Sequence, residues 1–222
     1  MAAITAAVIG FVIWDTQSNS DGALSDSDAA TVVQEGRQPD FSEVETRSED
    51  DPLVAGPVDA PVALVVFSDY QCPFCALWSD QTLPTMMEHV ADGDLRIEWR
   101  DLNVYGPESE RAARAAYAAA LQGEFWEYHG ELFAKGKKRP KSELSKEALV
   151  DLAQDIGLDT DQFVADMESE ETAEVIAANQ QSGFDVGAVA TPVFVLDGQA
   201  VVGAQSTDVF EQMFTEALEA AE

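Results

Sequence analysis

Residues 62–75 read VALVVFSDYQCPFC and decide the fold class. The run from Val62 to Phe67 is continuously apolar and rich in β-branched residues, which is typical of a strand buried on both faces of a sheet covered by helices. Four loop residues lead to CPFC, and the apolar residues after it recur at helical spacing, with Pro73 where the first helical turn tolerates proline. The stretch predicts a strand, a short loop and a helix with both cysteines at its amino end.

The rest of the chain predicts an α/β fold that is interrupted by a helical block. Three further stretches have strand patterns: residues 95–102, 192–196 and 199–202. Asp197 and Gly198 form a hairpin signal between the last two, and a closing amphipathic helix follows. Between about residues 107 and 183 the apolar pattern is helical throughout, which is more than one crossover needs. We expect a folded domain over residues 52–222 with an all-helical insertion at about 107–183.

The first 51 residues have the composition of a leader and a linker. Residues 2–14 (AAITAAVIGFVIW) are apolar, but at about 1.5 Å per residue they reach only about 20 Å of a roughly 30 Å hydrocarbon core. No basic residue precedes them and no small-x-small cleavage site follows. We interpret residues 1–14 as a truncated signal or membrane anchor, with a buried N-terminal helix as the alternative. Residues 15–51 are rich in Ser, Asp, Glu and Gly, and we expect a disordered acidic linker.

The charge balance argues against nucleic-acid binding. The chain has 12 Lys and Arg against 42 Asp and Glu, a formal net charge of -30, which repels phosphate backbones. Half of the basic residues lie in residues 135–146 (KGKKRPKSELSK). We expect a solvated surface there, and the alternative is a docking loop for an acidic partner or a membrane surface.

Cys72 and Cys75 are the two cysteines of the chain, and their spacing predicts redox chemistry. On the first turn of a helix, residues three apart face each other, so their sulfurs can close a short disulfide ring. Unpaired N–H groups and the helix dipole stabilise a thiolate at the first cysteine and lower its pKa from about 8.5 to roughly 3.5–7.5. We therefore expect Cys72 to be the nucleophile and Cys75 to be the more buried resolving thiol.

Two other interpretations of the cysteine pair are weaker on physical grounds. An inert disulfide at this spacing would close too small a loop to constrain the unfolded chain much. A zinc site would be half filled by two thiolates from one chain, and His89 and His129 lack ligand spacing to the cysteines. We therefore expect no metal and no other cofactor.

Three segments together resemble the DsbA-like thiol-disulfide oxidoreductases of the thioredoxin superfamily: FSDYQCPFC at 67–75, FWEYHGELF at 125–133 and VATPVFVLDGQAVVGAQ at 189–205. The resemblance covers about residues 52–222 and implies a thioredoxin-like fold with an inserted helical subdomain. It implies that Pro192 is a cis-proline opposite the cysteines and that the backbone of Thr191 pairs with a substrate peptide. It also places Pro73 and Phe74 in the active-site loop.

Two positions depart from the family pattern. Strongly oxidising members often have His where this chain has Phe74, and many thioredoxin-fold proteins have a buried acid where this chain has Val66. Asp69 is the carboxylate nearest in sequence, and we expect it to be an exposed loop residue.

The residues and the resemblance together predict an extracytoplasmic thiol-disulfide oxidoreductase that forms or exchanges disulfides in exported proteins with free thiols. We expect a monomer that is anchored to the membrane at its N-terminus and is reoxidised by a membrane partner or a small-molecule oxidant. The alternatives are a reductase or isomerase of the same fold, a non-catalytic metal-binding or peptide-binding thioredoxin-like module, and a passive envelope tether.

Overall fold

The computed structural model describes residue 41 and residues 44–221. In chain order its strands, helices and short 3-10 helices (η) are β1 (Val54–Ala55), β2 (Val62–Ser68), α1 (Pro73–Gln81), α2 (Leu83–Asp92), β3 (Leu95–Asp101), α3 (Pro107–Ala120), α4 (Phe125–Leu132), η1 (Ala134–Gly136), η2 (Lys141–Leu144), α5 (Lys146–Asp155), α6 (Thr160–Glu168), α7 (Glu170–Asp185), β4 (Val193–Leu196), β5 (Gln199–Val202) and α8 (Thr207–Ala221). Over this part of the chain no helix has both the length and the apolar character needed to cross a membrane.

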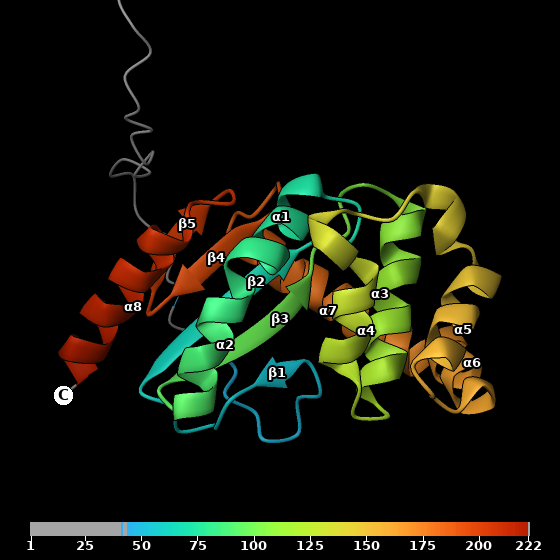
Figure 1. The fold of residues 1–222 in the computed structure, drawn as a ribbon, viewed down its shortest axis with the longest axis horizontal. Helices are drawn as coiled ribbons and strands as arrows, with labels where there is room; N and C mark the ends of the chain where they lie inside the picture. Colours follow the sequence, from blue (N-terminus) through green and yellow to red (C-terminus); the bar gives the residue numbers. More distant parts are fainter. Residues whose placement is uncertain (1–40, 42–43, 222) are drawn as a thin grey trace, which may run out of the picture. The chain divides into compact units, whose positions relative to one another are not determined.

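The sheet has the strand order β1-β3-β2-β4-β5 (Figure 1). β2 is buried along its whole length, as its apolar run predicts, and it pairs in parallel with β3 and antiparallel with β4. The parallel register runs from Val62 opposite Leu95 to Ser68 opposite Asp101, so β2 and β3 end at the same edge of the sheet.

Helices cover both faces of this sheet. α1 and α8 pack on one face, where Trp78 and Phe210 contact Phe194 of β4 with ring centroids 4.7 and 4.8 Å apart. α7 packs on the other face. There a Cβ added at Gly183 would lie 3.0 Å from Leu102 and 3.1 Å from Phe67, so the absent side chain lets the helix approach the sheet.

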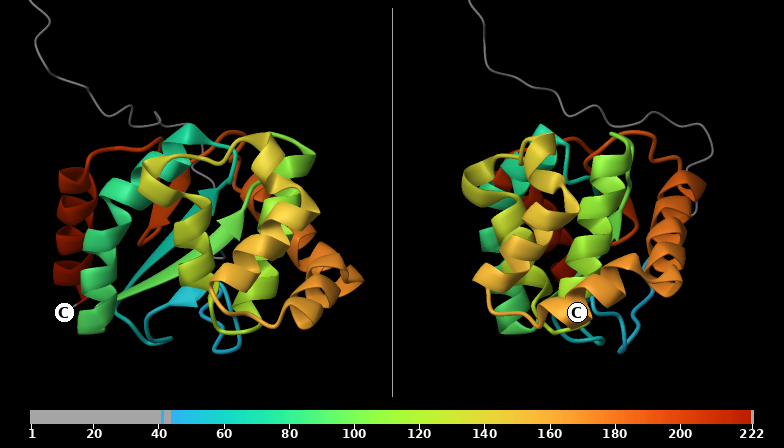
Figure 2. Two further views of the ribbon diagram at one scale, coloured as in Figure 1. Left: turned by 45° about the vertical axis from the view of Figure 1, so that its right-hand side comes forward. Right: turned by 90° about the vertical axis from the view of Figure 1, so that its right-hand side faces the viewer.

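The helical block stands between β3 and β4 and is formed by α3 to α7, over Pro107–Asp185. Figures 1 and 2 show α3, α4, α5 and α6 grouped to one side of the sheet. The centre of this group is α3, whose small buried residues such as Ala116 let neighbouring helices approach closely. The α/β fold with an inserted helical subdomain is therefore present.

The β4–β5 hairpin sets where residues 191 and 192 lie. Asp197 and Gly198 form its turn with φ of 46° and 71°, the left-handed conformations that a two-residue hairpin turn of this kind requires. Because Val193 pairs with Phe67 in the antiparallel register, the residues before Val193 continue beyond the carboxyl end of β2. The hairpin therefore brings the Thr191–Pro192 pair to the edge where CPFC begins.

The packed chain starts before residue 52, so the linker prediction is wrong for residues 44–51. Val44 is 8% exposed and belongs to the core. The backbone N–H groups of Thr46 and Arg47 donate to the Glu98 carboxylate at 2.9 and 2.8 Å. A polar segment becomes ordered here because it satisfies a charge buried in β3, and its own composition carries no sign of that partner. The anchor at residues 1–14 and most of the linker lie outside the described residues.

Candidate active site

The two cysteines lie at the amino end of α1. Cys72 is the N-cap residue with extended backbone (φ -86°, ψ 120°), Pro73 is the first helical residue, and Cys75 lies one turn further along. Both are free thiols. No side chain caps this helix end, so its N–H groups remain directed at the cysteine pair.

The structure brings Thr191 and Pro192 to the same place from 119 residues away in the sequence. The Cys72 thiol donates to the Thr191 carbonyl oxygen, with 3.3 Å between Sγ and O. The Thr191–Pro192 peptide bond is cis. Both sulfurs are enclosed, since Cys72 is 0% and Cys75 1% exposed. A substrate therefore reaches Cys72 only when side chains around it move.

The surroundings give the two thiols opposite acidities. A hydrogen bond from the Cys75 thiol is the main cause that lowers the pKa of Cys72 to about 6. The Thr191 side chain and the N–H groups of Cys75 and Phe74 add to it, against the effect of burial. Burial raises the pKa of Cys75 well above its usual value, and the neighbouring Cys72 sulfur raises it further. At neutral pH Cys72 is a thiolate and Cys75 a thiol.

Asp69 is buried, so the expectation of an exposed loop acid is wrong. It is 0% exposed, and its Oδ1 and Oδ2 accept from the backbone N–H groups of Gln71 at 2.7 Å and Tyr105 at 3.0 Å. Burial raises the pKa of this carboxyl. The side chain joins the loop before Cys72 to the loop after β3, and those N–H partners offset the burial of the carboxylate.

A buried polar pair, which was not predicted, lies behind Cys75. Ser68 and Asp101 stand opposite each other at the ends of β2 and β3, and the Ser68 hydroxyl lies beside the Cys75 thiol. Asp101 Oδ1 accepts from Trp99 Nε1 at 3.4 Å, whereas within the described residues Asp101 Oδ2 and Ser68 Oγ have no hydrogen-bond partner. Burial raises the pKa of Asp101 to about 7. Alternation along β3 places Asp101 on the inward side with Trp99, and that signal could have identified it.

Apolar and aromatic side chains are exposed near the sulfurs. Phe74 is 58%, Tyr105 46% and Val189 78% exposed. Burial and the nearby Cys72 sulfur raise the pKa of the Tyr105 phenol. Exposed large side chains beside a reactive sulfur offer contact area for a polypeptide.

The hydrogen bonds of the two histidines go to residues other than the cysteines. His129 is 2% exposed, bonds through Nδ1 to the Tyr70 hydroxyl and through Nε2 to Ser79 Oγ, each at 3.2 Å, and burial lowers its pKa to about 3. His89 Nε2 pairs with Glu211 at 2.7 Å. Across the described chain, no three His, Cys, Asp or Glu side chains are grouped so that they could hold a metal ion.

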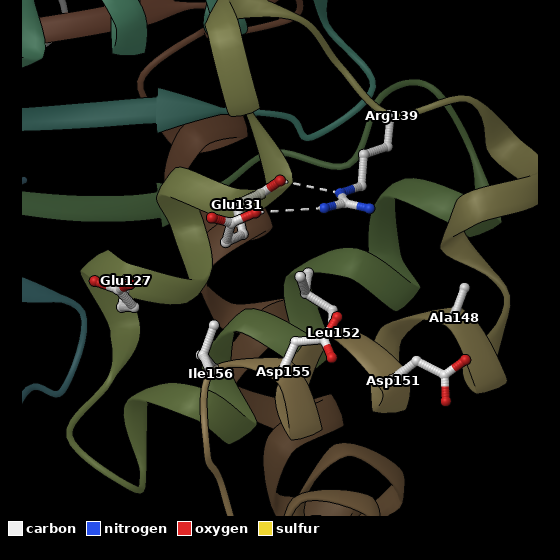
Figure 3. Close-up of a pocket in the computed structure, with 8 residues that line it drawn as sticks. All are labelled: Glu127, Glu131, Arg139, Ala148, Asp151, Leu152, Asp155 and Ile156. Atoms are coloured by element: carbon white, nitrogen blue, oxygen red, sulfur yellow. Dashed lines mark hydrogen bonds and ion pairs between the residues drawn. The ribbon is translucent and has the colours of Figure 1, made fainter.

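A separate pocket of about 650 Å³ lies by α4 and α5 (Figure 3). Half of its lining residues are acidic: the lining is formed by Glu127, Glu131, Arg139, Ala148, Asp151, Leu152, Asp155 and Ile156. Its lining has no nucleophilic sulfur or hydroxyl, so the candidate active site is at Cys72 rather than in this pocket.

Comparisons with known proteins agree with the fold. The thioredoxin family model matches residues 48–216. The Na(+)/H(+) antiporter NhaA of Herminiimonas arsenicoxydans is 34% identical over 154 residues, which are 68% of this chain and 23% of that protein. The chain thus spans about a quarter of the length of the NhaA relatives it matches.

Two further similarities concern disulfide chemistry. The probable disulfide bond formation protein D of Bacillus anthracis is 29% identical over 126 residues, which are 54% of this chain and 58% of that protein. The crystal structure of the thiol-disulfide exchange protein alpha-DsbA2 from Wolbachia pipientis superposes with a TM-score of 0.66 at 22% identity, covering 79% of this chain and 92% of that one. The resemblance of the fold to DsbA-like proteins is confirmed.

Proposed function

Because the chain belongs to the thioredoxin family, we propose that it is a thiol-disulfide oxidoreductase that works through Cys72 and Cys75. One observation carries the proposal: Cys72 is the N-cap residue of α1, and its sulfur has a pKa of about 6 and lies 3.3 Å from the Thr191 carbonyl oxygen. A low-pKa sulfur is both the better leaving group and the more ionised nucleophile in disulfide exchange. A purely structural disulfide needs neither property.

The proposed reaction begins with the oxidised pair. A substrate thiolate attacks the Cys72 sulfur, a bond forms between these two sulfurs, the Cys72–Cys75 bond breaks, and Cys75 leaves with the electron pair and takes a proton. A second thiolate of the substrate then attacks the substrate sulfur that is bonded to Cys72 in the mixed disulfide. Cys72 leaves as a thiolate and the substrate holds a new disulfide. The protein gains two electrons and the substrate loses two.

Thr191, Pro192, Pro73 and Phe74 have supporting roles in this proposal. The backbone of Thr191 pairs with the substrate chain beside Cys72, and Pro192 fixes where that backbone lies. Pro73 begins α1 without an N–H group to satisfy, and exposed Phe74 contacts the substrate.

Asp101 and Ser68 supply the proton path for Cys75. The Cys75 thiolate is unfavourable because its pKa is raised, so its proton must be accepted and returned nearby. Val66 is apolar and cannot do this. The Ser68 hydroxyl lies beside the Cys75 thiol. Asp101 stands opposite Ser68, and one of its carboxylate oxygens has no hydrogen-bond partner among the described residues.

The direction of electron flow that we propose is oxidation of the substrate. Lowering the pKa of Cys72 from 9.0 to about 6 favours the reduced, ionised form of the pair. At pH 7 the ionisation gained by this shift is worth about 1.4 kcal/mol, which adds about 30 mV of oxidising power. Phe74 contributes no charge of its own, so the N–H groups and the Cys75 thiol supply the effect.

We place this activity outside the cytoplasm, with residues 1–14 as the anchor and the following acidic residues as the tether. The substrates are then exported proteins with free thiols, and the reoxidant is a membrane partner or a small molecule. The similarity to a probable disulfide bond formation protein supports this location. We propose that the protein acts as a monomer.

The reduction potential tests the proposal. The full chain is equilibrated with glutathione buffers, and the fraction of oxidised pair is measured by alkylation and mass. We expect a potential well above that of thioredoxin, about -270 mV, and nearer to about -120 mV. A reduction potential at or below about -270 mV would exclude a role in oxidising substrates and would favour a reductase instead. A Cys72 pKa near 8.5 would indicate a binding module instead.

A further inference from the structure

Cationic side chains are unevenly distributed over this acidic chain. Only 12 basic residues oppose 42 acidic ones, and half of the basic ones lie in residues 135–146. In the rest of the described chain the basic side chains are bound within the domain: Arg47 to Glu45, Arg96 and Arg100 to Glu98, Arg111 to Leu144 O, and Arg114 to Met167 O. The stretch 135–146 is therefore where cationic groups are free to meet another molecule.

Three lysines of this stretch form no ion pair within the part of the chain that the structure describes. The other three cations are neutralised: Arg139 by Glu131 and Glu143, Lys141 by Glu108, and Lys146 by Glu168. Figure 3 shows the Arg139 guanidinium beside Glu131. Lys135, Lys137 and Lys138 are exposed and form no ion pair with any residue that the structure describes.

Hydrogen bonds through Gln71 fix the loop that carries these lysines next to the residue before Cys72. Gln71 directly precedes Cys72 and is 2% exposed. Its Nε2 donates to the Arg139 carbonyl oxygen at 2.9 Å, and Lys138 Nζ donates to its Oε1 at 3.3 Å. On the other side, a Cβ added at Gly136 would lie 3.0 Å from the Asp80 side chain of α1. The loop is thus packed against both the residue before Cys72 and the helix after it.

We propose that Lys135, Lys137 and Lys138 form a docking surface for acidic residues that flank the reacting cysteine of a substrate protein. This inference rests on the proposed function, because a substrate chain that brings its sulfur to Cys72 passes close to Gln71. Unpaired ammonium groups there attract an acidic segment, while most of the protein surface repels it. The surface thereby selects both the substrate and the direction from which it approaches.

An anionic membrane matches this surface less well than an acidic segment does. Lipid-binding basic clusters have about four to eight Lys or Arg, and a membrane also meets the acidic surface around the loop. A short peptide segment meets mainly the charges within a screening length of about 8–10 Å. Three lysines in a loop bonded to Gln71 are sufficient for the peptide and too few for the membrane.

Rates of disulfide exchange with two peptides test the inference. The oxidised full chain reacts with reduced single-cysteine peptides, one flanked by Asp and Glu and the other by Asn and Gln. We expect the acidic peptide to react about fivefold faster at low ionic strength and at about the same rate as the neutral peptide at about 0.5 M salt. The K135Q/K137Q variant should lose this preference.

The K141Q/K146Q variant is the matched control, since it also removes two positive charges from the stretch but only ones already paired with carboxylates. It should keep the preference. Equal rates for both peptides with the unmodified protein would overturn the docking surface and leave the proposed function intact. Absence of exchange with either peptide would instead contradict the proposed function. Binding to anionic vesicles that K135Q/K137Q abolishes, without a peptide preference, would assign the loop to lipid and also overturn the inference.

Discussion

The Cys72 sulfur owes its acidity to a few named neighbours, and the first prediction concerns the largest of them. Because the hydrogen bond from Cys75 contributes most to lowering the pKa of Cys72 to about 6, alkylation of the reduced protein should be half-maximal near pH 6. The C75A variant loses that hydrogen bond and should react about threefold or more slowly at pH 6. Iodoacetamide labelling followed by mass spectrometry measures both rates. Identical pH profiles for the two proteins would contradict the assigned cause.

Asp101 gives a second prediction at the level of one side chain. Burial raises its pKa from 3.8 to about 7, so the unfolded chain ionises it at lower pH than the folded protein does. Its contribution to stability is complete below about pH 4 and is lost as the pH rises to about 7, up to about 4 kcal/mol. The D101N variant should not show this loss of stability, because an amide does not ionise.

Urea unfolding of the oxidised protein at pH 5 and pH 8 measures the effect of Asp101. The oxidised form is chosen because the reduced Cys72 thiol has a lowered pKa and would make stability rise with pH, in the opposite direction. If the unmodified protein and D101N lost equal stability between the two pH values, the ionisation of Asp101 would not be the cause.

At the scale of elements, β3 shows how one strand organises two faces. Its inward residues include Trp99, while Arg96, Glu98 and Arg100 point to the other side and are covered by residues 44–51. Burial alone would raise the pKa of Glu98, but hydrogen bonds from Arg96 and from the N–H groups of that segment hold it below its usual range. The charged face of β3 is therefore the attachment site of the N-terminal segment.

The E98Q variant tests that role. It leaves two buried guanidinium groups facing a neutral amide, and we expect a loss of about 3–5 kcal/mol of stability. Amide hydrogen exchange at residues 46 and 47 should accelerate most, because their N–H groups donate to Glu98. E45Q is the control, since Glu45 pairs only with half-exposed Arg47 and should cost less than about 1 kcal/mol. Similar losses in the two variants would contradict the central role of Glu98.

Elements with a local signal could be predicted from the sequence, and those that depend on a distant partner could not. The buried strand β2 and the Asp197-Gly198 turn can be predicted from their own residues, because an apolar run and an Asp-Gly pair are local signals. Residues 44–51 look like a disordered linker because the carboxylate that orders them lies in β3. Asp69 looks like an exposed loop acid because its two N–H partners include Tyr105, 36 residues away.

The candidate site divides in the same way. The spacing of Cys72 and Cys75 predicts a redox pair, but only the family resemblance points to Thr191, which lies 119 residues from Cys72. Ser68 and Asp101 form a pair only once the β2–β3 register is known. Sequence patterns thus identify residues whose role depends on neighbours in the sequence. They miss residues whose role depends on a partner in another strand.

At the scale of the whole molecule, the net negative charge lowers the stability of the fold, whereas the lysines of the loop attract acidic substrates. A net charge of -30 over 222 residues means that folding brings like charges together. Salt screens this repulsion over about 8–10 Å, so raising sodium chloride from about 20 mM to 0.5 M should raise Tm by about 5 °C. Salt screens the buried ion pairs around Glu98 much less, so their weakening should not offset the rise in Tm.

The same salt should slow exchange with acidic peptides, because their attraction to Lys135, Lys137 and Lys138 is also screened. Circular dichroism melts and peptide exchange rates, measured on one salt series, should therefore move in opposite directions. Potassium chloride should give the same two trends if screening rather than binding of a particular cation is the cause. A Tm that falls with salt would show that exposed ion pairs such as Lys146–Glu168 outweigh the net repulsion, since these pairs are the groups that screening weakens.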